Sequence, residues 1–134
     1  MSNTKATGVA YLDPEFSTCY ATEEIGYAAA AQGTVTQATS KSTGVTLNKS
    51  AGQITMNNAS LASATNVAFT LTNSLISAND VLIVNVANGA ATAGTYNVFT
   101  STLAAGSATI VLRNISAGTL SEAVVINYAI IHGA

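Results

Sequence analysis

The stretch from Asn66 to Asn73, NVAFTLTN, decides the fold class because its side chains alternate in size and polarity. Every second side chain from Val67 to Leu71 is large and apolar, and the side chains between them are small. Successive side chains of an extended chain point to opposite faces, so this pattern predicts a β-strand with one buried face.

The same period of two continues on both sides of this stretch, in short segments separated by Asn, Gly, Ser and Ala turns. Short strands at such close spacing favour a sandwich or barrel over a fold with helical crossovers. We therefore expect one antiparallel β-sandwich domain over residues 32–134. Its eight expected strands are Gly33–Thr39, Gly44–Asn48, Gly52–Asn57, Asn66–Asn73, Asp80–Ala87, Thr95–Thr100, Ser107–Asn114 and Ser121–Ile131.

Two further expectations concern the inside of this domain. The segment Asp80–Ala87 is apolar on both faces, which predicts a central strand covered on both sides. The aromatic residues in and near the strands are expected in the core rather than on a sugar-binding surface, which usually adds stacking aromatic rings. They are Phe69, Tyr96, Phe99 and Tyr128.

The first 31 residues have a different composition and no strand pattern, and we interpret them as an N-terminal arm. Within the arm, only Thr22–Ala31 is helix-like, with Thr22 as a possible cap. The large apolar side chains of the arm either form a second layer on the home domain or anchor it to a neighbouring subunit. The sequence leaves both readings open for Tyr11, Leu12, Phe16, Tyr20, Ile25 and Tyr27.

The chain is poor in charge: of its 134 residues, 7% are charged and 49% are hydrophobic, and the formal net charge is −2. Four Lys and Arg residues are too few for a basic face, so we expect neither nucleic acid nor membrane as a partner. The chain shows no signal-peptide pattern and no long apolar run, so synthesis in a cytoplasm is expected. Low charge and apolar strand faces predict self-association, with a closed cyclic trimer as the expected form.

The residues that carry chemistry are few, and we expect no enzyme activity, no cofactor and no metal site. The single histidine, His132, lies near the C-terminus and has no partner nearby in sequence. The single cysteine, Cys19, has no neighbouring His or Lys to activate it. The acidic residues of the arm have no calcium-loop spacing and are interpreted as solvated or helix-capping; they are Asp13, Glu15, Glu23 and Glu24.

Most of the β region resembles a family of tailed-bacteriophage capsid decoration (cement) proteins. The resemblance covers residues 33–131 and is carried by three runs: GTVTQATSKSTGVTLNKSAGQITMNNASL, VAFTLTNSLISANDVLIVNV and SAGTLSEAVVINYAII. Within them, TQATSKSTGVTLN and LSEAVVIN are the specific pair. The resemblance implies a jelly-roll-like β-sandwich, commonly trimeric, on the outer surface of a capsid. It implies no catalytic residues.

From these observations the sequence predicts a non-enzymatic virion protein that binds the major capsid protein and stabilises the shell. The alternative is a head-fibre, knob or tail-fibre module of a phage that binds the host surface.

Overall fold

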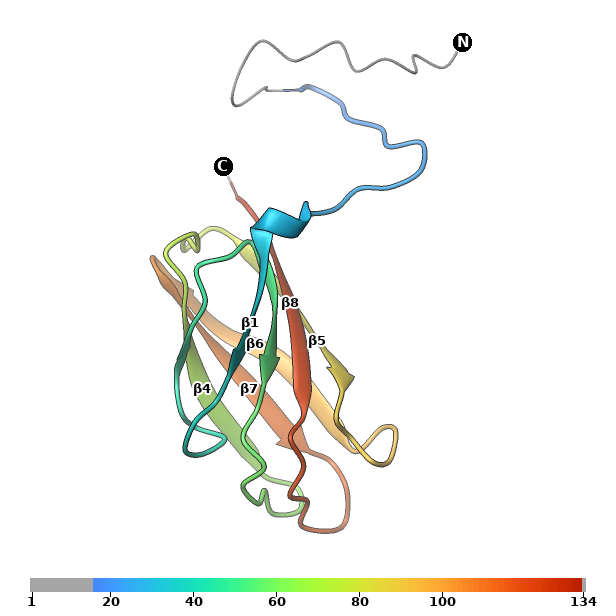
Figure 1. The fold of residues 1–134 in the computed structure, drawn as a ribbon, viewed down its shortest axis with the longest axis vertical. Coiled ribbons are helices and arrows are strands. Elements are labelled where there is room, and N and C mark those ends of the chain that lie inside the picture. Colours follow the sequence, from blue (N-terminus) through green and yellow to red (C-terminus); the bar gives the residue numbers. More distant parts are fainter. Residues whose placement is uncertain (1–15, 134) are drawn as a thin grey trace.

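The computed structural model describes residues 16–133, and its folded part is a sandwich of two four-stranded β-sheets (Figure 1). All eight expected strands are present, which confirms the all-β sandwich. They are β1 (Gln32–Thr36), β2 (Val45–Thr46), β3 (Ala51–Thr55), β4 (Asn66–Thr72), β5 (Val81–Asn88), β6 (Tyr96–Ala104), β7 (Ser107–Asn114) and β8 (Val125–Ile131).

The strand order is β1-β3-β8-β5 in the first sheet and β2-β4-β7-β6 in the second. Both sheets are mixed, because β1 pairs with β3 in parallel and β2 pairs with β4 in parallel. The chain alternates between the sheets at its start, so β1 and β3 run in the same direction, and so do β2 and β4. Side-chain alternation had suggested antiparallel strands throughout, but it reports which face is buried and not the direction of a neighbour.

The core lies between the sheets and contains the side chains that the alternation placed inward. Phe69 and Leu71 of β4 are buried, as are Ile126, Tyr128 and Ile130 of β8. The aromatic expectation holds for Phe69, Tyr96 and Tyr128. It is wrong for Phe99, which lies on the outer face of β6 and is 39% exposed.

The prediction of a central strand at Asp80–Ala87 is wrong. β5 is an edge strand of the first sheet, next to β8 only, and its side chains alternate between buried and exposed. Leu82 is buried, whereas Val81 and Ile83 are half exposed. A run that is apolar on both faces therefore has one uncovered apolar face in the single chain.

Buried amide side chains organise the turns between the strands. The side-chain amide of Asn73 donates to the backbone carbonyl of Lys49 (2.7 Å). Its side-chain oxygen accepts a hydrogen bond from the backbone N–H of Leu75 (3.0 Å). Asn114 donates to the carbonyls of Leu61 (2.9 Å) and Gly118 (2.8 Å). Both asparagines are fully buried, so these residues hold loops in place rather than contact solvent.

Candidate interaction surface

The arm joins the sandwich at Tyr27, whose hydroxyl donates a hydrogen bond to the carbonyl of Ile130 in β8. Gln32 donates to the carbonyl of Tyr27 (2.9 Å), and Lys49 donates to the carbonyl of Ala30 (2.8 Å). The Tyr27 side chain is 38% exposed. Tyr27 is therefore joined to the home domain through its hydroxyl, while its side chain remains partly exposed.

The helix expected over Thr22–Ala31 is not formed; among residues 16–31, the only helical element is a short 3-10 turn, η1 (Ala29–Ala31), directly before β1. An isolated segment of this length is a marginal helix in water, and its helical state must be stabilised by packing on the core. None of the residues of η1 is buried, so this stabilisation is missing here.

Residues 16–26 make no such attachment and are exposed throughout. Figure 1 shows this segment leading away from the end of the sandwich at which β8 ends. Tyr20 and Ile25 are 90% and 88% exposed, and Phe16 is also largely exposed. These three side chains are not a second layer on the home domain. Tyr11 and Leu12 lie outside the described residues.

A second exposed apolar surface lies on the outer face of the first sheet, at the edge formed by β5 and β8. Val81 pairs directly with Ile131, and Ile83 pairs with Ala129. Cross-strand partners have adjacent side chains on the same face of a sheet, so these four side chains form one contiguous group. We call this group the outer corner. Its three large side chains, Val81, Ile83 and Ile131, are 50 to 57% exposed.

The C-terminal end of β8 is fixed by the carboxylate of Asp80, which sits just before β5. Asp80 accepts hydrogen bonds from the backbone of Ser77 (2.8 Å), the hydroxyl of Ser77 (2.8 Å) and the backbone of Gly133 (3.1 Å). The Nδ1 atom of His132 lies 3.1 Å from the same carboxylate. The backbone hydrogen bond from Ser77 lowers the pKa of Asp80 most, and with the other donors it brings that pKa to about 2.

The side chain of His132 is exposed, and it has a charged partner that the sequence analysis missed. This partner, Asp80, is 52 residues away in the sequence. The one sequence signal is the Ser-x-x-Asp spacing of residues 77–80, which is typical of a carboxylate that accepts hydrogen bonds within its own turn. The arrangement does not provide a nucleophile, because the hydroxyl of Ser77 donates to Asp80 and not to His132. The contact joins the Ser77–Asp80 turn to the His132–Gly133 segment.

Lys41 is a buried cation within the run TQATSKSTG. Its ammonium donates to the carbonyls of Asn57 and Glu122, and burial lowers its pKa while the Glu122 charge acts in the opposite direction. The amide of Gln37 donates to the carbonyls of Lys41 (3.0 Å) and Thr43 (2.8 Å). These residues tie one loop to two others, so the run is structural in this chain.

Two buried tyrosines have raised pKa values for the same reason. Burial raises the pKa of Tyr128 to about 12, and its hydroxyl donates to the carbonyls of Leu47 and Lys49. Burial and the nearby Glu122 carboxylate raise the pKa of Tyr96. Both groups stay protonated at neutral pH and contribute to packing.

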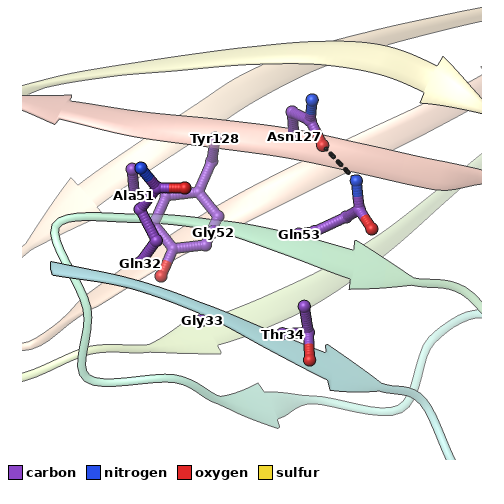
Figure 2. Close-up of a pocket in the computed structure, with 8 residues that line it drawn as sticks. All are labelled: Gln32, Gly33, Thr34, Ala51, Gly52, Gln53, Asn127 and Tyr128. Carbon is purple, nitrogen blue, oxygen red and sulfur yellow. Dashed lines mark hydrogen bonds between the residues drawn. The ribbon is translucent and has the colours of Figure 1, made fainter. Parts of the chain in front are cut away.

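A shallow polar depression of about 410 Å³ lies across β1, β3 and β8 of the first sheet (Figure 2). Gln53 donates to the side-chain carbonyl of Asn127 (3.0 Å), and Figure 2 shows this amide pair joined across two neighbouring strands. Gln32 and Thr34 of β1 also line the depression. It presents amide and hydroxyl groups and contains no charged side chain.

Within residues 16–133, no cluster of three or more His, Cys, Asp or Glu side chains could hold a metal ion. Cys19 is an exposed free thiol on the arm, and Glu23 and Glu24 of the arm are also exposed. Asp13 and Glu15 lie outside the described residues. No helix in the same part of the chain is long and apolar enough to cross a membrane.

Comparison with known proteins assigns no family. No protein-family model, curated protein or solved structure matches this chain.

Proposed function

We propose that this chain is a non-enzymatic structural protein of a tailed-phage virion, which decorates the outer surface of the capsid and stabilises the shell. The observation that carries the proposal is the exposed arm. Phe16, Tyr20 and Ile25 project from a sandwich whose own core is already closed. Large apolar side chains gain free energy when a partner covers them, at about 25 cal/mol per Å² of apolar surface.

The charge-poor composition supports the same role. Charged side chains normally keep the surfaces of free monomers soluble and apart, and only 7% of this chain is charged. A surface of this kind suits permanent assembly, in which much of it is covered. On a shell, many copies reinforce one another, so a modest contact per copy is sufficient.

In this proposal the arm binds a neighbouring subunit on the capsid. The sandwich remains on the outside, and the major capsid protein below it is the partner that the assembly stabilises. The resemblance of residues 33–131 to decoration proteins is consistent with this role.

The test mixes purified protein with capsids of the source phage that lack it, and measures bound copies by sedimentation. Variants are the chain without residues 1–26, which keeps the Tyr27 attachment, and the triple substitution Phe16→Ala, Tyr20→Ala and Ile25→Ala. We expect both variants to bind at strongly reduced occupancy. The matched control, Thr18→Ala with Thr22→Ala, should bind as the unmodified chain does.

Full occupancy by both arm variants would show that the arm does not attach the protein. Failure of the unmodified chain to bind such capsids would contradict the decoration role itself. Thermal melting of the free variants provides the folding control.

The polar depression on the first sheet favours a second candidate, a fibre or knob module that binds the host surface. Its amide and hydroxyl groups match the hydrogen-bonding groups of surface glycans. Tyr128 is the aromatic residue among those that line it, and this side chain is buried. Under this alternative, the purified protein competes with phage adsorption to host cells, and the double substitution Gln53→Ala and Asn127→Ala abolishes the competition. Absence of competition at saturating protein would exclude it.

A further inference from the structure

The outer corner is unusual because it combines an edge position with uncovered aliphatic side chains. Val81, Ile83 and Ile131 are each at least half exposed, and cross-strand pairing makes them neighbours. Other exposed large aliphatic side chains of the sandwich, such as Leu75 and Ile115, lie in turns outside the sheets. A contiguous apolar patch of this kind on a sheet face indicates an interaction site.

The arm of the same chain is attached near the C-terminal end of β8 and does not cover the outer corner. Tyr27 bonds to the carbonyl of Ile130, the residue before Ile131. From there, residues 16–26 lead away from the sandwich (Figure 1). Each copy therefore leaves two apolar surfaces open at one end of the molecule, one on the arm and one on the sheet.

The free part of the arm is longer than the outer corner. The eleven residues from 16 to 26 span at most about 36–40 Å when extended, at roughly 3.3–3.6 Å per residue. On β5, the outer corner extends only from Val81 to Ile83, or about 7 Å at roughly 3.4 Å per residue. An arm that stays attached at Tyr27 can thus run along the edge of an adjacent molecule.

We propose that residues 16–26 of one copy lie on the outer corner of a second copy of this chain. This inference rests on the proposed assembly role of the arm and names its partner as a copy of the same chain. Ile25 and Tyr20 contact Val81, Ile83 and Ile131 of the neighbour, and apolar side chains on both surfaces leave water together.

The contact is heterologous, because the arm of one copy meets the sheet of the next. Contacts of this type close into rings when the rotation permits it. The aromatic side chains of one arm bury on the order of 150–250 Å² each, so a single contact is smaller than the roughly 1,600 Å² of a standard interface. A closed ring gives every copy two such contacts, which agrees with the expected trimer.

Site-directed disulfide formation tests the contact in the free protein. In a Cys19→Ser background, a copy with Ile25→Cys is mixed with a copy of different size that carries Ile83→Cys, and the mixture is oxidised under non-denaturing conditions. We expect the mixed-size dimer to form in at least tenfold excess over the matched control, in which Thr34→Cys replaces Ile83→Cys. Thr34 is exposed on β1, at the opposite edge of the same sheet.

Equal yields from Ile83→Cys and Thr34→Cys would overturn the inference. So would a disulfide found only within one chain when Ile25→Cys and Ile83→Cys are combined, because the arm would then cover its own corner.

Light scattering gives a second, independent measurement. The unmodified chain is expected to associate beyond its 13.4 kDa monomer at micromolar concentration, and Ile83→Asp is expected to return it to the monomer. Thr34→Asp should leave the association unchanged, and circular dichroism checks that both variants fold. A monomeric unmodified chain, or association that persists in Ile83→Asp, would contradict the contact. Because no capsid is present, these results are separate from the test of decoration.

Discussion

The side chain of Asp80 connects two segments that are far apart in the sequence. Its carboxylate engages the Ser77 turn on one side and the His132–Gly133 segment on the other. It lies directly before Val81, so it fixes the end of the outer corner. A carboxylate with several donors stays ionised at unusually low pH, which is the origin of its pKa of about 2.

This pKa predicts a specific loss of stability in acid. The folded-state pKa of Asp80 lies below its ordinary value of 3.8, so the ionised carboxylate stabilises the folded state above about pH 4. That contribution is lost as the pH falls from about 4 towards 2. We expect Asp80→Asn to melt at lower temperature than the unmodified chain at pH 7, with the difference shrinking towards pH 2. A difference that is constant over this range would contradict the linkage.

Lys41 gives a prediction about a buried donor. Lys41→Ala leaves the carbonyls of Asn57 and Glu122 without their shared donor, and each buried unpaired group costs about 1–3 kcal/mol. We expect a loss of at least about 2 kcal/mol in the free energy of unfolding, measured with urea. The matched control is Lys49→Ala, which removes one exposed hydrogen bond and should cost about 1 kcal/mol or less. Equal losses for the two variants would contradict the account of Lys41.

At the scale of elements, the sequence predicts the strands well and their neighbours poorly. Alternation in segments such as Asn66–Asn73 marks inward side chains, because a period of two reports burial directly. It does not report which strands are adjacent, so the parallel pairing of β1 with β3 was not foreseen. It also placed Asp80–Ala87 in the centre of a sheet. A strand with apolar side chains on both faces has the same sequence pattern whether its second face is covered or left open.

The candidate interaction surface on the arm was also predicted only in part. The apolar side chains of the arm stand out in the sequence, since they lie in a region without a strand pattern. Their exposure in the single chain could not be predicted, because it depends on whether the sandwich offers a surface that accepts them. Tyr27 contacts the sandwich at the end of β8, whereas Tyr20 and Ile25 remain exposed.

The pairing of β1 with β3 depends on two facing glycines, and this gives a prediction at the element scale. Gly33 pairs with Gly52, and a Cβ atom on Gly52 would lie 2.7 Å from Leu47 and 2.9 Å from the carbonyl of Gly33. We expect Gly52→Ala to destabilise the sandwich by about 1–3 kcal/mol, because the backbone must shift to admit the methyl group. Gly118→Ala, where no atom lies within 4 Å, should change stability by about 0.5 kcal/mol or less. Urea unfolding of the two variants provides the comparison.

At the scale of the whole molecule, the sandwich and the free part of the arm are energetically separate. The described attachments of the arm begin at Tyr27, and residues 16–26 are exposed. We therefore expect deletion of residues 1–26 to change the free energy of unfolding of the monomer by about 0.5 kcal/mol or less. A larger loss in a denaturant titration at low protein concentration would show that the arm belongs to the home core.

Separation of a closed domain from an exposed apolar arm is typical of a chain that completes its structure in an assembly. Under the proposed decoration role, neighbouring copies and the shell cover this surface, which accounts for its few charges. A module that binds the host from the tip of a fibre or tail is present in few copies, whereas a decoration protein covers a symmetric shell.

Copy number per virion is therefore the most direct test of the central claim. Purified virions are digested, and peptides of this chain are quantified against peptides of the major capsid protein by mass spectrometry with isotope-labelled standards. The decoration role predicts copies on the order of hundreds per virion, in a fixed ratio to the capsid protein, as expected for a shell built by repeated contacts. A dozen copies or fewer would contradict it and would place the chain on a tail or vertex fibre.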